Sequence, residues 1–227
     1  MVNSVADLTL TKTRSRWAVI KRLRKLWLGL AAMFVAALLV TAMLMRPVSP
    51  TDLGIGNRLL TSQVLSSWRD GDLIVLVRHE ERCDRSPHPC LGPADGLTVL
   101  GSETATAIGK AFKNLGMEGS DVLSSPTTRT AQTSLFMFGK TDLSPGPLAI
   151  CGDAMGEEIL GHKTPGRNLL LITHSACIND FEQANGFRHA AGAEYGSSLF
   201  VKVNPDHTFK ILGIMNAEDW AAALKQL

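Results

Sequence analysis

One uncharged stretch near the start of the chain limits its possible folds more than any other feature. The run LWLGLAAMFVAALLVTAMLM, Leu26–Met45, contains no Asp, Glu, Lys or Arg. As a helix it would be about 30 Å long, which matches the hydrocarbon thickness of a bilayer. A helix in a globular core rarely runs this far without a polar face. We therefore predict one transmembrane helix at 26–45, followed by a domain outside the bilayer.

The charges on either side predict the orientation of this helix. Residues 1–25 hold seven Lys or Arg and one acid, whereas the rest holds 16 of the 23 basic and 20 of the 21 acidic residues. The positive-inside rule then keeps residues 1–25 in the cytoplasm and exports everything after residue 46. The exported part has a net charge of about −4, which argues against nucleic acid as a partner.

Two fates are open for the apolar stretch. The long basic segment before it favours an uncleaved signal anchor, while the small residues Val40-Thr41-Ala42 would suit cleavage of a signal peptide. Residues 46–56 are rich in Pro, Gly and Ser, which is typical of a linker. We expect the folded domain to occupy residues 57–227.

Export also changes the interpretation of the four cysteines, Cys83, Cys90, Cys151 and Cys177. An even number of exported cysteines favours disulfides, and no CxxC or Cys/His spacing indicates a metal site. We expect one bridge among Cys83, Cys90 and Cys151, with the partners left open. Cys177 is interpreted as a small buried residue.

Strand-like and helix-like segments alternate through the domain. The runs LIVLV and NLLLIT are strongly aliphatic, as in strands buried on both faces. Shorter strands are expected at 121–125 and 147–151, and a hairpin at 197–215 around Asn204-Pro205-Asp206. Helices are expected at 59–68, at 100–115, from Ser125-Pro126 to about 138, at 153–161, after His174 and from Asn216. This order predicts an α/β fold, a three-layer α/β/α sandwich with a mostly parallel sheet.

The two most aliphatic strands both end in a histidine. One ends in Arg78-His79, the other in His174, and Arg129 falls in the first turn of a helix. Ligands bind at the carboxyl ends of strands in such sheets, and Arg82 follows in the same loop. Arginines suit phosphate oxygens, and a neutral imidazole can attack phosphorus. We therefore predict a phosphate site at this edge.

Four segments in this order resemble the histidine phosphatase superfamily, which includes the phosphoglycerate mutases. They are VRHEER (77–82), LTVLG (97–101), SSPTTRTAQT (124–133) and ITHSA (172–176). The resemblance implies that His79 is the phosphorylated nucleophile, and that Arg78, Arg129 and His174 surround the phosphate, with Arg82 as an additional arginine. It also implies chemistry without a metal or a cofactor.

Two positions depart from the family pattern. Most members have Gly or Ala where Glu80 stands, and a carboxylate there would repel phosphate unless it points away. One branch has an acid directly after the second histidine, where this chain has Ser175. The other branch takes a Glu from a later segment, for which Glu157 fits best, with Glu158 and Asp153 as further candidates.

A narrower resemblance concerns the segments RHEERCDRSPHPCL and ICG (150–152). They are similar to exported phosphatases of the heptose phosphate in the lipopolysaccharide core. This implies a phosphorylated sugar or glycolipid as substrate, in the periplasm, with the chain anchored in a bacterial inner membrane or released from it after cleavage. The alternative function is a catalytically idle, anchored relative that binds phosphorylated ligands.

Overall fold

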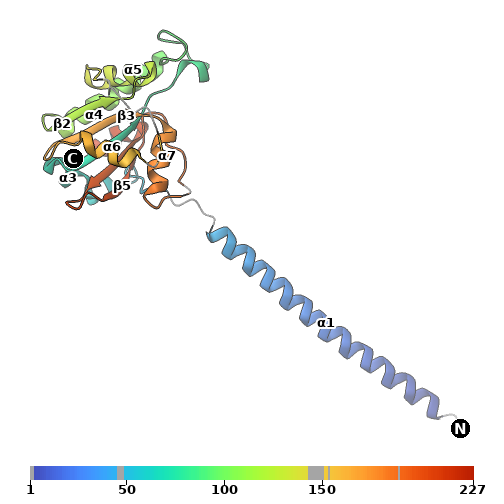
Figure 1. Cartoon of the computed structure of the whole chain (residues 1–227). Coiled ribbons are helices and arrows are strands. Elements are labelled where there is room, and N and C mark those ends of the chain that lie inside the picture. The colour runs from blue at the N-terminus through green and yellow to red at the C-terminus, as the bar shows by residue number, and fades with distance from the viewer. Residues whose placement is uncertain (1–2, 45–48, 143–150, 153, 189) are drawn as a thin grey trace. The chain divides into compact units, whose positions relative to one another are not determined.

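The computed structural model describes residues 3–44, 49–142, 151–152, 154–188 and 190–227. It divides into two units, Met1–Arg46 and Pro47–Leu227. The first unit is a single long helix, α1 (Asn3–Leu44) (Figure 1). Its segment Lys21–Thr41 is long and apolar enough to cross a membrane, and none of that segment is buried. A signal sequence near the N-terminus has the same properties, so both predicted fates fit this helix.

The second unit is built on a five-stranded sheet with the order β2-β3-β1-β4-β5. The strands are β1 (Leu73–Arg78), β2 (Ser120–Ser124), β3 (Asn168–Thr173), β4 (Ser198–Val203) and β5 (Phe209–Met215). Strands β1, β2 and β3 are parallel, whereas β4 is antiparallel to both of its neighbours. The α/β class is confirmed, and the sheet is mixed but mostly parallel, since β4 alone among the five described strands runs opposite to the others. The short turn between β4 and β5 explains this, because such a turn can join only antiparallel strands.

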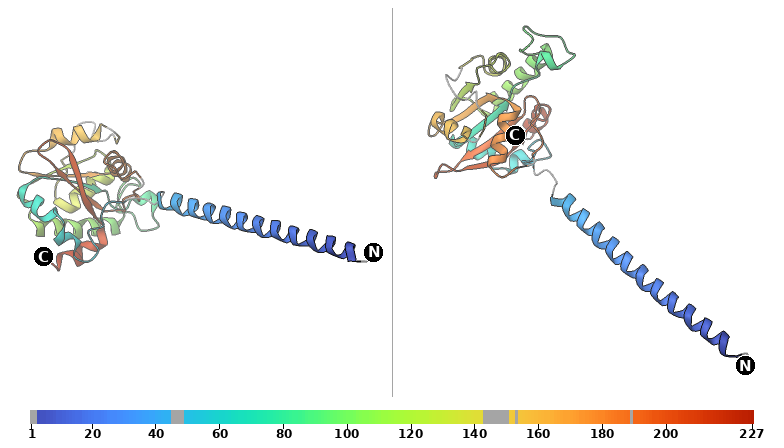
Figure 2. Two further views of the ribbon diagram at one scale, coloured as in Figure 1. Left: turned by 90° about the horizontal axis from the view of Figure 1, so that it is seen from below. Right: turned by 45° about the vertical axis from the view of Figure 1, so that its right-hand side comes forward.

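Helices cover both faces of this sheet (Figure 2). They are α2 (Arg58–Thr61), α3 (Val64–Asp70), α4 (Val99–Leu115), α5 (Thr128–Phe138), α6 (Met155–His162), α7 (Ser175–Ala184) and α8 (Trp220–Leu224). Successive residues of β1 belong to two different cores. Val75 and Val77 pack with α3, α4, α5 and α8, whereas Ile74 and Leu76 pack with α6 and α7. Alternation of side chains along a strand buried on both faces produces the predicted three-layer sandwich.

The domain begins earlier in the chain than the sequence indicated. Leu53 is fully buried in the core, and Asp52 pairs with Ile214 beside the last strand. Residues 51–54 therefore pack with the domain, although 46–56 has the composition of a linker. The polar residues and glycines of this segment form turns against the sheet, and one leucine among them supplies the apolar contact.

Two helix ends also differ from the sequence expectation. Helix α5 begins at Thr128, with Thr127 as N-cap and a capping box with Thr130, instead of at Ser125-Pro126. Asn216 does not cap the last helix with its side chain, and accepts a hydrogen bond from Ser197 Oγ instead. In both cases a tertiary or local side-chain contact competes with the cap that the sequence suggested. Most of the strand expected at 147–151 lies outside the described residues.

Candidate active site

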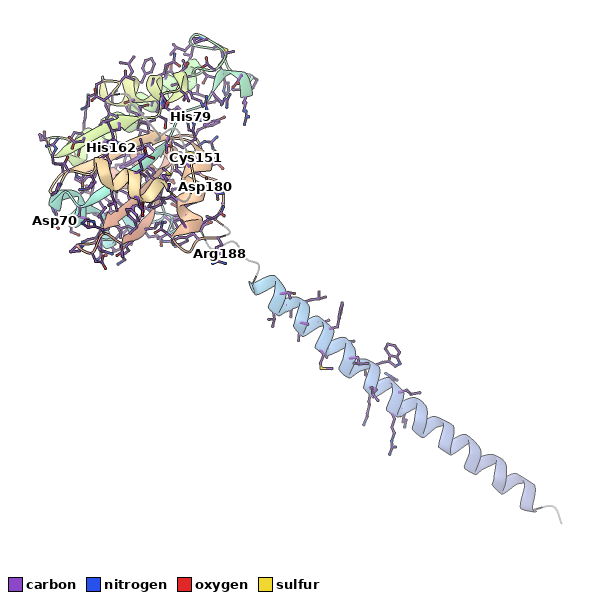
Figure 3. The ribbon with its side chains drawn as sticks, viewed as in Figure 1. Asp70, His79, Cys151, His162, Asp180 and Arg188 are labelled. Atoms are coloured by element: carbon purple, nitrogen blue, oxygen red, sulfur yellow. A yellow bond between two sulfur atoms is a disulfide. The ribbon has the colours of Figure 1, made fainter. Side chains whose placement is uncertain are left out.

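The site is built where the two most aliphatic strands end side by side. Strands β1 and β3 pair in parallel, with Arg78 opposite Thr173. The next residues along the two strands are His79 and His174, so their rings come to the same edge, with centroids 5.3 Å apart. Figure 3 labels His79, which is 4% exposed. Parallel pairing in this register makes the two histidines neighbours although they are far apart in sequence.

Arg129 connects the two rings. It lies in the first turn of α5, whose capping box holds the start of the helix. Its Nε donates to His79 Nε2 at 3.2 Å, and its Nη2 lies 3.4 Å from His174 Nδ1. Thr133, one turn later, accepts a hydrogen bond from the Glu80 amide and donates to the Arg129 carbonyl. The helix is therefore tied to the residue that follows the nucleophile candidate.

The hydrogen bonds of His79 assign its tautomer. Its Nδ1 lies 2.8 Å from the Glu80 carbonyl, which can only accept, so Nδ1 carries the proton. The lone pair is then on Nε2, the atom that accepts from Arg129. Burial, followed by the charges of His174, Arg129 and Arg78, lowers the pKa of His79 to about 3. The ring is therefore neutral at pH 7, as a nucleophilic imidazole must be.

His174 is neutral for the same reasons. Burial is the main cause that lowers its pKa to about 4, and the charges of Arg129 and Arg82 add to it. The pocket by itself therefore favours uncharged imidazoles beside charged guanidinium groups. An anion bound between them would reverse this electrostatic balance and favour a proton on His174.

Arg78 reaches the site from the last position of β1. Its Nη1 donates to the Ala193 carbonyl at 2.5 Å, and its guanidinium carbon lies 3.9 Å from the centre of the Tyr195 ring. The same tyrosine ring is 5.8 Å from that of His79. Sequence analysis missed Tyr195, because no motif or periodicity distinguishes it. The sequence offered one signal, which is that Tyr195 is the only tyrosine in the chain.

Arg82 lies near the pocket but is bound to another partner. Its Nε and Nη2 both donate to the Asp84 carboxylate, at 2.6 and 2.5 Å. No described contact joins it to either histidine, although its charge contributes to the lowered pKa of His174. Of the four predicted phosphate ligands, the structure thus brings Arg78, Arg129 and His174 around His79 and leaves Arg82 paired at the rim.

The side chain of Glu80 points away from the pocket, so the repulsion of phosphate expected from a carboxylate at this position is avoided. Its side chain is buried, and an added Cβ on Gly196 would meet its Oε1, Ile108 and Ala217. Oε1 has no hydrogen-bond partner among the described residues. Burial, opposed in part by a hydrogen bond from the Glu81 amide, raises the pKa of this carboxyl to about 7. Glu80 is therefore a buried packing residue whose carboxyl is only partly ionised at pH 7.

The candidate proton donors are not brought to the histidines. Glu157 is exposed in the first turn of α6, and Glu158 is half-buried with one oxygen unpartnered. Neither has a contact with His79 or His174 among the described residues, and Asp153 lies outside them. The carboxylates whose charges act on the site arginines are different ones, namely Asp84 and Asp95 on Arg129, and Glu194 and Glu80 on Arg78.

Two disulfides flank the pocket, where one was predicted. Cys83–Cys90 closes the loop that directly follows Arg82, and agrees with the expected bridge. Cys151–Cys177 is the second, so the interpretation of Cys177 as an unpaired buried residue was wrong. Cys177 is indeed buried, but it lies in the first turn of α7, three residues after His174. Within the described ranges, no cluster of three His, Cys, Asp or Glu residues is arranged to hold a metal ion.

Comparisons with known proteins show which sequences and structures this chain resembles. No family model matches the sequence. Lipopolysaccharide core heptose(II)-phosphate phosphatases from Salmonella typhi and Escherichia coli are 36% and 38% identical over 109 residues, or 47% of this chain and 54% of theirs. The chain therefore spans about half the length of the curated relatives it matches, and is homologous to them over that part.

Solved structures show the same fold. The phosphoglycerate mutase of Bacillus anthracis superposes with a TM-score of 0.52 at 15% identity, over 69% of this chain and 99% of that one. The protein histidine phosphatase SixA complexed with tungstate gives 0.51 at 15% identity, over 65% and 98%. The expected resemblance in fold is confirmed.

Proposed function

We propose that this chain, which has the fold of the histidine phosphatase superfamily, is a phosphomonoesterase that works through a phosphohistidine at His79. The observation that carries the proposal is the neutral His79 ring, whose Nε2 atom lies 3.2 Å from Arg129 Nε and directs its lone pair toward it. A nucleophile with its lone pair facing a guanidinium, and a second neutral histidine beside it, suits a tetrahedral anion.

The proposed reaction has two steps. In the first, His79 Nε2 attacks phosphorus, the bond from phosphorus to the ester oxygen breaks, and a carboxylic acid gives its proton to the leaving oxygen. In the second, the resulting carboxylate takes a proton from water, which attacks phosphorus, and the phosphorus–nitrogen bond breaks. Arg78, Arg129 and His174 bind the phosphoryl oxygens in both steps. Glu157 is the acid in this proposal, with Glu158 and Asp153 as alternatives.

The substrate in this proposal is a phosphorylated sugar, specifically a heptose phosphate of the lipopolysaccharide core. The partial homology to phosphatases named for that activity supports it. The apolar helix α1 supports a location at the bacterial inner membrane with the domain in the periplasm, whether the helix anchors the chain or is cleaved as a signal sequence. Arg82, paired with Asp84 at the rim, would contact the phosphate or its sugar.

The test is phosphate release from an aryl phosphate by the full chain in detergent, with excess EDTA present. His79→Ala removes the nucleophile, and His162→Ala is the matched control, since His162 is an exposed histidine of α6. We expect activity in the wild type and the control and none in His79→Ala, whose melting temperature should stay close to wild type. An active His79→Ala chain would refute the phosphohistidine mechanism.

The substrate is tested separately. Phosphorylated core oligosaccharide and a simple sugar phosphate are compared by kcat/KM in the same detergent. A clear preference for the core oligosaccharide supports the narrower assignment, whereas equal values reduce the proposal to a general sugar phosphatase.

A second function is favoured by one observation, the exposed position of Glu157 without a contact to the histidines. A domain that lacks its proton donor would bind phosphorylated ligands without turning them over. Calorimetry with inorganic phosphate distinguishes the two functions. Binding without turnover of either an aryl phosphate or the core oligosaccharide supports the idle relative, and turnover excludes it.

A further inference from the structure

The segment Ala193–Ser197, here called the strap, lies against Arg78, and its Tyr195 ring is 5.8 Å from the His79 ring. Its backbone holds Arg78 at three points. The Ala193 carbonyl accepts from Arg78 Nη1 at 2.5 Å, the Gly196 amide donates to the Arg78 carbonyl at 3.2 Å, and the Ser197 carbonyl accepts from the Arg78 amide at 2.9 Å. The strap thus binds both the main chain and the side chain of Arg78.

The strap is itself held from two sides. Gly196 has a φ of +69°, and an added Cβ would come within 2.1 Å of Glu80 Oε1, so this position requires glycine. Ser197 is fully buried, and its hydroxyl donates to Asn216 Oδ1 at 2.9 Å. The backbone of the strap is therefore fixed before any substrate enters, and Tyr195 projects from a rigid position.

Tyr195 uses that position to cover the Arg78 guanidinium. The guanidinium carbon is 3.9 Å from the ring centre, well within cation–π range. The ring is half-buried, and Arg78 Nε is buried without a hydrogen-bond partner among the described residues. Nη1 is already bound to Ala193, and the guanidinium also interacts with the Tyr195 hydroxyl, so its rotation is restricted by these polar contacts and by the ring face.

We propose that Tyr195 is a positioning residue, whose ring holds the Arg78 guanidinium in the orientation that binds the phosphoryl group beside His79. The inference rests on the proposed phosphatase function. A planar guanidinium binds two oxygens only when its plane is aligned with them, and a small misorientation is costly to a reaction that depends on positioning. The role is assigned to the ring face, and the hydroxyl, which also interacts with the Arg78 side chain, is tested separately by Tyr195→Phe.

Tyr195→Met tests the proposal, because methionine keeps an apolar side chain of moderate size but has no ring face. We expect kcat/KM for an aryl phosphate to fall about tenfold, and inhibition by inorganic phosphate to weaken about tenfold, as loss of a partly desolvated cation–π contact implies. Tyr195→Phe should restore both values to within about threefold of wild type. Phe209→Met is the matched control, a half-buried aromatic residue on β5, and should leave both values unchanged.

Two results would overturn the proposal. One is Tyr195→Met with unchanged phosphate inhibition, and the other is Tyr195→Phe as impaired as Tyr195→Met, which would assign the role to the hydroxyl. In the double variant Arg78→Lys/Tyr195→Met, the tyrosine change should cost less than it does alone. Full additivity of the two changes would mean that Tyr195 does not act through Arg78.

A measurement independent of turnover separates this proposal from the proposed function. The Nε–H proton of Arg78, identified by its loss in Arg78→Lys, should give a protected NMR signal in the wild type and in Tyr195→Phe. It should exchange rapidly in Tyr195→Met. A wild type without activity or phosphate binding contradicts the phosphatase function, whereas equal protection in all three chains contradicts the positioning role.

Discussion

Replacement of Glu80 by glutamine should stabilise the domain at alkaline pH. Burial raises the pKa of this carboxyl from 4.5 to about 7. Below pH 4.5 it is protonated in both the folded and the unfolded chain. As pH rises toward 7, the unfolded chain ionises first, so the folded state loses stability. Each pKa unit corresponds to about 1.4 kcal/mol, so the loss above pH 7 amounts to about 3 kcal/mol.

Glutamine cannot ionise, so Glu80→Gln should avoid this loss. We expect a melting temperature roughly 6–12 °C above wild type at pH 8, and a difference close to zero at pH 4. The assay is thermal unfolding of the full chain in detergent, followed by near-ultraviolet circular dichroism. Glu103→Gln is the matched control, since Glu103 is exposed on α4, and should shift the melting temperature little at either pH.

The same variant also tests where the Glu80 side chain points. Because its carboxyl lies beside Gly196 and only its carbonyl contacts His79, Glu80→Gln should keep wild-type turnover of an aryl phosphate. A Glu80→Gln chain no more stable than wild type at pH 8, or equally stabilised at pH 4 and pH 8, would refute the argument from burial.

Three further predictions concern the rest of the domain. Replacing both cysteines of Cys151–Cys177 by serine should lower the free energy of unfolding by about 3.5 kcal/mol, and the same change at Cys83–Cys90 should lower it by about 2.5 kcal/mol, because the loops closed span 26 and 7 residues. The measurement is denaturant unfolding, and a larger loss for Cys83–Cys90 than for Cys151–Cys177 would contradict the prediction. Leu53→Ala should lower the free energy of unfolding by about 2–5 kcal/mol, since Leu53 is fully buried. Ile55→Ala, at an exposed position, should lower it little. Equal losses for the two variants would mean that this segment is not packed with the domain. Nitrogen NMR should find His79 protonated at Nδ1 alone at pH 5, and an imidazolium there would contradict the lowered pKa.

Much of the fold could be predicted because its signals are local. The aliphatic runs of β1 and β3, the apolar period of α4 and the short β4–β5 turn each depend on a few consecutive residues. The strand order and the start of α5 at Thr128 were less accessible, since they depend on strand pairing and on competition between neighbouring caps. Residues 51–54 were assigned to a linker because composition does not reveal that a single leucine is buried.

The sequence by itself determined the chemistry that this edge of the sheet can hold. Histidines that end two aliphatic strands, with Arg78 before one of them and Arg129 at a helix start, must meet once parallel strands pair. Only the tertiary structure decided how those groups are held. The Ala193 carbonyl that binds Arg78 lies 115 residues away, and no periodicity marks Tyr195, the Cys151–Cys177 pairing or the inward turn of Glu80. Such contacts arise from packing between distant segments, whereas a strand or a helix is specified by the side chains of its own residues.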